Sequence, residues 1–130
     1  MAVVKAKKFL GQHFLKDLDI ARRIADTLDD FPDVPVIEVG PGMGVLTQYL
    51  IEKEKELTVV ELDRDSVPYL NEHYPTLQGH IIEDDFLKLD LLKIYNSQFC
   101  VIGNYPYNIS SQIFFKVLDY KTVSYTHLRA

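Results

Sequence analysis

The sequence contains little cysteine, no long hydrophobic run and no acidic residue near its start. Its single cysteine, Cys100, excludes an internal disulfide. Because Cys100 lies in the apolar run 99–102, we expect a buried strand residue and not a nucleophile or metal ligand. No apolar stretch approaches the ~20 residues of a membrane span, and the first residues lack the apolar core of a signal peptide. We therefore expect a cytoplasmic protein with no membrane partner and no metal site.

Acidic residues are absent from residues 1–16, which contain four lysines, whereas the whole chain has a net charge of −5. A local charge of +4 is thus followed by −9 over the remaining residues. A short basic arm on an acidic body is suited to contacting phosphates, although a solvated tail would have the same composition. With 130 residues, 47% hydrophobic and 25% charged, the chain is expected to form one globular domain at most.

A glycine-rich turn stands between a strand pattern and a helix pattern. β-Branched residues at 36–39 predict a buried parallel strand, and apolar residues recur with helical spacing from Val45. Between them, Gly40, Gly42 and Gly44 allow a sharp turn and are expected to aim free N–H groups of a new helix at an anionic or polar ligand. A purely structural strand-to-helix turn would contain the same glycines.

The spacing of these glycines narrows the choice of ligand. The pattern Glu38-x-Gly40-x-Gly42-x-Gly44 differs by one residue from the dinucleotide fingerprint G-x-G-x-x-G, which argues against a pyrophosphate. An acidic residue, Glu61, ends the next predicted strand, where a ribose-binding carboxylate belongs. Together these features resemble the class I S-adenosylmethionine-dependent methyltransferases. The resemblance implies a Rossmann-like α/β fold and S-adenosyl-L-methionine as cofactor, bound in part by the three glycines and Glu61.

Hydrophobic periodicity predicts the other elements of the fold. Strands are expected at about 36–40, 57–62, 80–83 and 99–103, and helices after Asp17, through 46–51, after Asp65 or Ser66, and from Ile109. The charge run at 52–56 is expected to be solvated surface and nothing more.

Asp85 follows the third predicted strand, at the edge of the sheet where α/β proteins bind ligands. A carboxylate there can accept a hydrogen bond from an exocyclic amine. By the resemblance, Asp85 matches the family position that recognises the cofactor's adenine. An acidic loop residue or a helix cap is the alternative for Asp85 taken alone.

Residues 9–15, Phe-Leu-Gly-Gln-His-Phe-Leu, are unusually apolar for a chain terminus. Followed by a helix, they resemble the N-terminal segment of the ribosomal RNA adenine dimethyltransferases, a family that includes small-subunit enzymes and the macrolide-resistance methylases. In that family the segment lies across the cofactor, so the resemblance implies that Gln12, His13 and Leu15 help to bind it. Taken alone, His13 is more typical of a surface or packed histidine.

The fourth predicted strand runs directly into the motif Asn104-Tyr105-Pro106-Tyr107. The amino nitrogen of adenine is a poor nucleophile because its lone pair is delocalised into the ring. The Asn104 side-chain carbonyl and the Tyr105 backbone carbonyl, held extended by Pro106, can each accept one amino hydrogen and localise that lone pair. Tyr107 offers a face on which an extruded base can stack.

This motif resembles the family phrase Gly-Asn-Leu-Pro-Tyr-Asn-Ile-Ser, with Tyr105 where leucine is common. The resemblance implies that residues 104–107 are catalytic and that Asn104 also contacts the cofactor. A plain turn leaving a strand is the alternative for the tetrapeptide alone.

The resemblance runs from about Lys7 to Lys121 and implies an N-terminal cofactor-covering arm at 1–16 and a partial catalytic domain at 17–121. Residues 122–130 do not resemble the family's continuation, so we expect them to be non-native and foreign to the fold. The sheet would then be truncated after its fourth strand. That strand would be an open apolar edge and would promote self-association of this chain, whereas a full-length form is expected to be monomeric.

The implied function is S-adenosylmethionine-dependent dimethylation of adenine N6 in small-subunit, 16S-type ribosomal RNA during ribosome biogenesis, with this chain a fragment that is inactive alone. The segment at 10–15 resembles small-subunit enzymes more than resistance methylases. The alternatives are a large-subunit methylase of the macrolide-resistance type, a non-catalytic RNA- or ribosome-binding module, and a methyltransferase acting on protein or small-molecule amines.

Overall fold

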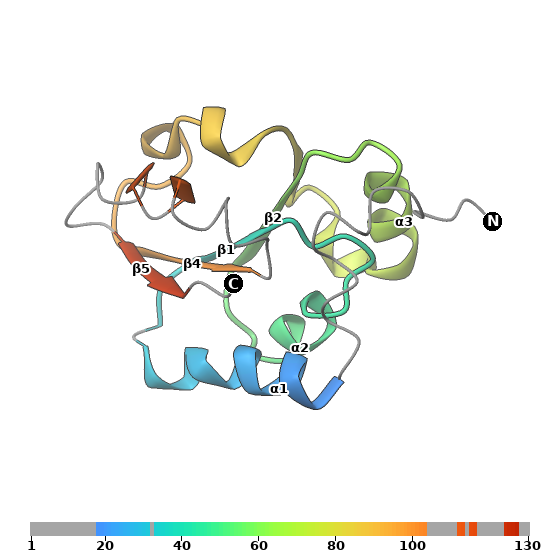
Figure 1. Cartoon of the computed structure of the whole chain (residues 1–130), viewed down its shortest axis with the longest axis horizontal. Coiled ribbons are helices and arrows are strands. Elements are labelled where there is room, and N and C mark those ends of the chain that lie inside the picture. Colours follow the sequence, from blue (N-terminus) through green and yellow to red (C-terminus); the bar gives the residue numbers. More distant parts are fainter. Residues whose placement is uncertain (1–17, 32, 104–111, 114, 117–123, 128–130) are drawn as a thin grey trace.

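The computed structural model describes residues 18–31, 33–103, 112–113, 115–116 and 124–127, which form an α/β protein around a parallel sheet (Figure 1). The strand order is β3-β2-β1-β4-β5, and all four pairings are parallel. The strands are β1 (Val36–Val39), β2 (Leu57–Glu61), β3 (Ile81–Glu83), β4 (Phe99–Gly103) and β5 (Ser124–His127). The predicted α/β fold and the first four strands are confirmed, with boundaries that differ by at most one residue.

Short helices connect the strands. Helix α1 (Leu18–Asp26) tightens into the 3₁₀ turn η3 (Thr27–Asp30), and the expected cap of α1 at Asp17 lies outside the described residues. The remaining helical elements are α2 (Thr47–Ile51), α3 (Ser66–His73), η4 (Pro75–Leu77), η5 (Phe86–Lys88) and η6 (Leu91–Lys93). Residues 112–113 and 115–116 are also helical, as expected for the segment after Ile109.

The sheet is covered on both faces along β1, β2 and β4, because side chains of opposite orientation along these strands enter two separate cores. On one face, Val36, Val59 and Ile102 pack with α1, α2 and α3. On the other face, Ile37 and Val101 pack with η5, η6 and Ile113. Figure 1 shows α1 and α2 on one side of the sheet and the segment with η5 and η6 on the other. The helical stripe expected for residues 20–28 is confirmed, with Ala21, Ile24, Ala25 and Leu28 buried.

Cys100 is a buried strand residue, as its apolar neighbours predicted. Only 1% of its surface is exposed, and burial raises the pKa of its thiol to about 11. A thiol with this pKa is protonated at neutral pH and is therefore a poor nucleophile.

The expectation that β4 is an open edge is wrong. Ser124–His127 forms β5, whose residues pair in parallel with Phe99 to Ile102 of β4. The interpretation of residues 122–130 as foreign to the fold relied on their lack of family resemblance. Residues 124–127 pair within the sheet and are therefore part of the fold, whereas the non-native origin expected for residues 122–130 stays a prediction.

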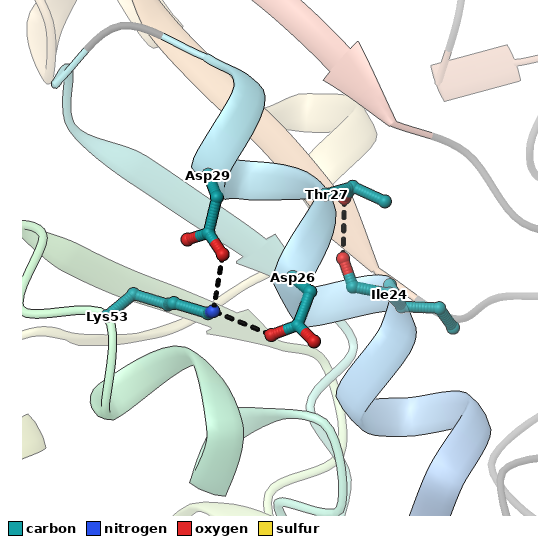
Figure 2. A network of polar contacts seen from close by, with 5 residues as sticks. All are labelled: Ile24, Asp26, Thr27, Asp29 and Lys53. Atoms are coloured by element: carbon teal, nitrogen blue, oxygen red, sulfur yellow. Dashed lines mark hydrogen bonds and ion pairs between the residues drawn. The ribbon is translucent and has the colours of Figure 1, made fainter.

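The charge run at 52–56 does more than face solvent. Glu52, Glu54 and Glu56 are exposed, but the Lys53 ammonium contacts Asp26 at 2.6 Å and Asp29 at 3.0 Å (Figure 2). The side chain of Lys53 is only 18% exposed. The pair of contacts therefore fastens the end of α2 to the α1–η3 junction, which the Thr27 hydroxyl also supports by donating to the Ile24 carbonyl (Figure 2).

The order of the strands creates a point where the chain changes direction along the sheet. Strand β1 has β2 on one side and β4 on the other, so the connections that leave β1 and β4 at their carboxyl ends lead in opposite directions along the sheet. Val39 and Gly103 are register partners at the ends of these strands. The glycine turn and residue 104 therefore follow neighbouring strands at the same edge.

Candidate cofactor and active site

The glycine loop, residues 40–46, leaves β1 and leads into α2. The helix begins at Thr47, one residue later than the predicted 46–51, because residues 42–46 form turns. The N–H groups of the three glycines themselves are already used within the protein, so any N–H group free for a ligand would have to come from the start of α2, as expected from the sequence. Gly40 donates to the Val60 carbonyl at 2.9 Å, Gly42 to Glu61 Oε1 at 2.7 Å, and Gly44 to the Pro41 carbonyl at 2.9 Å. The loop is therefore held by its own backbone and by one carboxylate.

Glu61 provides that carboxylate at the carboxyl end of β2. Its side chain is 4% exposed, and its second oxygen, Oε2, accepts the Asp63 N–H at 2.9 Å. A carboxylate has about four acceptor sites, two on each oxygen, and these two hydrogen bonds together with the weaker one from the Leu62 N–H leave part of that capacity unused. Glu61 therefore fixes the loop while retaining sites for further donors.

Glu38 is a second buried carboxyl beside the same loop. It is 1% exposed, and the Thr47 hydroxyl at the start of α2 donates to its Oε1 at 2.5 Å. Glu38 thus connects the strand before the glycine loop to the helix after it. The sequence pattern included Glu38 but gave no sign of its partner.

Burial raises the pKa of both carboxyls. For Glu38, burial outweighs the hydrogen bond from Thr47, and the pKa rises from 4.5 to about 8, with a further upward contribution from the charge of Glu61. For Glu61, burial raises the pKa, while the N–H groups of Asp63 and Gly42 oppose the rise by stabilising the charged form. Since these N–H groups favour the ionised form, Glu61 is the better placed of the two to act as an anion at neutral pH.

Asp85 follows β3 at the same edge of the sheet as Glu61, as predicted. The Asp84 N–H between them donates to the Glu61 carbonyl at 3.2 Å. Asp85 is half-buried and is also the N-cap of η5, with Oδ1 accepting the Leu87 N–H at 3.0 Å. The capping role weighed as an alternative is therefore present, and it uses only one of the carboxylate oxygens.

Two further residues lie near these carboxylates, and the sequence analysis predicted no role for either of them. Leu62, directly after Glu61, is 69% exposed, so its apolar side chain is accessible at the edge of the sheet where β2 ends. Lys116 donates to the carbonyls of Leu87 at 3.1 Å and Leu89 at 2.5 Å and lies 5.7 Å from the centre of the Phe86 ring. Lys116 therefore connects the helical segment after β4 to the turn that begins at Asp85.

The other predicted site residues lie outside the described residues. These are the arm residues Gln12, His13 and Leu15 and the motif residues Asn104, Tyr105, Pro106 and Tyr107. Their roles stay predictions. The structure brings together Gly40, Gly42, Gly44, Glu61 and Asp85, and it places Gly103, immediately before the motif, in register with Val39.

Comparison with known proteins agrees with this arrangement. A family model described as "Ribosomal RNA adenine dimethylase" matches residues 3–129. The chain belongs to this family. The match to the rRNA adenine dimethylases extends past Lys121, where the sequence analysis placed the end of the resemblance.

Similar family members are small-subunit enzymes by name. The "Ribosomal RNA small subunit methyltransferase A" of Parabacteroides distasonis is 72% identical over 121 residues, covering 93% of this chain and 46% of that protein. The protein of the same name from Phocaeicola vulgatus is 65% identical over 122 residues, covering 93% of this chain and 44% of that protein. The chain therefore spans about half the length of the curated relatives it matches.

Solved structures support the fold of this rRNA adenine dimethylase chain. The 23S rRNA methyltransferase ErmE matches with a TM-score of 0.67 and 30% identity, over 88% of this chain and 47% of that one. A dimethyladenosine transferase from Plasmodium falciparum matches with a TM-score of 0.63 and 19% identity, over 88% and 42%. The fold is that of the class I S-adenosylmethionine-dependent methyltransferases.

Within the described part of the chain, no group of three or more histidine, cysteine, aspartate or glutamate residues is arranged to hold a metal ion. None of the helices there has the length and apolar character of a membrane span.

Proposed function

We propose that a protein carrying this chain transfers methyl groups to adenine N6 in small-subunit ribosomal RNA and so forms dimethyladenine. The observation that carries the proposal is the register of Val39 with Gly103, since it brings the glycine loop and the strand before Asn104 to one edge of the sheet. The 72% identity to a small-subunit methyltransferase supports the choice of RNA. Such a substrate would place the protein in the cytoplasm.

The described residues fit S-adenosylmethionine as the cofactor. Glu61 retains acceptor sites for the two ribose hydroxyls, and the exposed side chain of Leu62 offers an apolar face to the adenine ring. Asp85 has one oxygen beyond its capping bond for the adenine amino group. A Cβ atom built on Gly40 would meet none of the described residues within 4 Å, so they leave space beside the loop for a ligand. The cofactor, when bound, supplies an electrophilic methyl group on a sulfonium sulfur.

The motif after β4 would prepare the nucleophile. Asn104 and the Tyr105 carbonyl accept the two amino hydrogens of adenine, and Tyr107 stacks on the extruded base. Pro106 keeps Tyr105 extended. No strong general base is needed, because the alkylated ammonium is acidic enough to lose its proton to water or a nearby carbonyl. Most of the acceleration would come from alignment and electrostatics.

The N-terminal residues would complete the site. Gln12, His13 and Leu15 cover the cofactor, and the four lysines of residues 1–16 contact RNA phosphates. The full-length protein would act as a monomer on precursor small-subunit RNA.

Methylation of large-subunit RNA is the second candidate, favoured by the 30% identity to the 23S rRNA methyltransferase ErmE. The identity to small-subunit enzymes is more than twice as high over a similar share of the chain, so we rank methylation of large-subunit RNA lower.

The test is methyl transfer by a full-length form to unmethylated small-subunit and large-subunit RNA in parallel. We expect dimethyladenine in the small-subunit RNA alone. Asn104→Ala should weaken cofactor binding much less than turnover and should lower the single-turnover rate by about 10²–10³, the loss typical of one electrostatic contact. The matched control is Asn96→Ala, at an exposed asparagine.

Three other outcomes would change the proposal. Transfer to large-subunit RNA alone would favour the second candidate, and cofactor binding without transfer would favour a non-catalytic module. Near-normal transfer by Asn104→Ala would remove Asn104 from catalysis.

A further inference from the structure

Tyr74 lies against the glycine loop, thirty residues away in sequence from Gly44. It is the residue that ends α3, and its ring reaches back to the loop. A Cβ atom built on Gly44 would lie 2.4 Å from Tyr74 Cε2 and 2.8 Å from its hydroxyl oxygen, far closer than such atoms approach in proteins. The Tyr74 hydroxyl also lies 3.3 Å from the Gly44 carbonyl oxygen and 3.4 Å from that of Met43.

Gly40 and Gly44 therefore lack side chains for different reasons. Both have positive φ, +68° at Gly40 and +87° at Gly44, which favours glycine. At Gly40 an added Cβ would enter open space, whereas at Gly44 it would overlap the Tyr74 ring. The open space beside Gly40 is suited to a ligand. At Gly44 the Tyr74 ring already occupies the volume that a side chain would need.

We infer that Tyr74 is a positioning residue that holds residues 43–44 of the glycine loop in the conformation that binds the cofactor, and that glycine at position 44 is required by this ring. The inference rests on the proposed function, because it takes the loop as the cofactor site.

Tyr74 is itself held on rigid backbone. Its N–H donates to the Leu70 carbonyl at 2.9 Å, and its own carbonyl accepts the Leu77 N–H at 2.9 Å. The ring is thereby fixed between α3 and η4, so it can transmit this rigidity to the loop.

The aromatic ring of Tyr74 contributes more than its hydroxyl to holding residues 43–44 of the glycine loop. One hydroxyl proton is shared between two carbonyls at 3.3 and 3.4 Å, beyond the usual range of O–H···O hydrogen bonds. Partial burial raises the pKa of Tyr74, so its hydroxyl stays protonated and able to donate over the whole pH range of a binding assay. Removal of the hydroxyl alone should therefore matter less than removal of the ring.

The experiment compares Tyr74→Phe, Tyr74→Ala, Gly44→Ala and the double variant in a full-length form. S-adenosylmethionine affinity is measured by calorimetry, and the urea midpoint of unfolding by circular dichroism. We expect Tyr74→Phe to bind within about threefold of the parent, and Tyr74→Ala at least tenfold more weakly, with a raised KM for the cofactor and a nearly unchanged kcat. Tyr69→Ala, which removes a ring of the same helix stacked on His73, is the control and should bind normally.

The double variant tests the contact itself. Gly44→Ala should lower the urea midpoint much more in the parent than in the Tyr74→Ala background, because the ring it would strike is gone. Equal losses in both backgrounds, or normal cofactor affinity in folded Tyr74→Ala, would overturn the inference. Failure of the parent to bind S-adenosylmethionine would instead count against the proposed function, and the urea comparison would still decide whether Tyr74 imposes glycine at position 44.

Discussion

Glu61 joins two parts of the site that lie 19 residues apart in the sequence, the glycine loop at Gly42 and the end of β2. Sequence reasoning identified the residue through its place after a strand, and the expected partner was a ribose. The structure adds a second role, since the same carboxylate accepts the N–H groups of Gly42 and Asp63. Such a backbone partner could not be predicted, because it depends on how the loop folds back over β2.

Glu61→Ala should lower S-adenosylmethionine affinity by at least tenfold, since charge-assisted hydrogen bonds contribute roughly 1.5–3 kcal/mol each. Part of the loss would come from the freed Gly42 N–H. Glu83→Ala, at the end of β3 and in register with Glu61 but exposed, is the matched control and should bind normally. Calorimetry on a full-length form checks both, and an unchanged affinity for Glu61→Ala would remove Glu61 from the cofactor site.

Glu38 makes the free energy of unfolding depend on pH, in a direction that follows from its raised pKa. Below about pH 4.5 its carboxyl is protonated in both the folded and the unfolded chain. Between 4.5 and about 8 the unfolded chain releases the proton while the folded protein keeps it, so the free energy of unfolding falls as pH rises through this window.

Glu38→Gln should therefore stabilise the protein at pH 8 by on the order of 2–4 kcal/mol, and the gain should shrink toward pH 5. The amide oxygen can still accept the Thr47 hydroxyl. Urea denaturation across this pH range measures the effect, with the exposed Glu72→Gln as control. A variant less stable than the parent at every pH would mean that the carboxyl makes a contact that an amide cannot replace.

At the scale of elements, the strands were the most predictable part of the fold. The run 99–103 is apolar throughout and the run 36–39 is apolar except for Glu38, a pattern typical of parallel strands that are covered on both faces. The helices were less well predicted, because α2 is five residues long and η5 and η6 are single turns without a repeating apolar stripe. Strand β5 was missed because its pairing with β4 is set by backbone hydrogen bonds, which leave little trace in four residues.

Lys116 shows how the elements are held together around the site. Its ammonium lies between the Leu87 and Leu89 carbonyls, so it secures the turn after Asp85 to the helical segment after β4. Lys116→Met keeps most of the apolar length of the side chain and removes the ammonium donor. We expect it to lower the free energy of unfolding by about 1–3 kcal/mol and to speed hydrogen exchange in residues 86–89.

The control is Lys93→Met, an exposed lysine on η6, which should change neither quantity. If exchange at 86–89 were unaffected in Lys116→Met, the turn would be held by its own backbone and Lys116 would have no positioning role.

At the scale of the whole molecule, the prediction for this 130-residue chain alone is that it transfers no measurable methyl groups to RNA, because it spans about half the length of its relatives. The argument for self-association changes with β5. The sheet runs from β3 to β5, so among the described residues the two edges without a further strand partner are those of β3 and β5, and β4 lies inside the sheet. Backbone groups at such an edge can still pair with a second chain.

Light scattering and a methylation assay, run on this chain and on a form extended to the length of the relatives, would check both expectations. The shorter chain should scatter as an oligomer and be inactive, and the longer one should be monomeric and active. A monomeric, active 130-residue chain would show that the catalytic unit is complete without the remaining half.

The solitary thiol of Cys100 has a use that follows from its burial in β4, between β1 and β5. An alkylating reagent can reach it only when the sheet opens, so the labelling rate reports the population of opened molecules. A ligand that binds the closed protein should slow labelling in proportion to its saturation. The rate of Cys100 alkylation thus measures the stability of the native chain without an engineered probe.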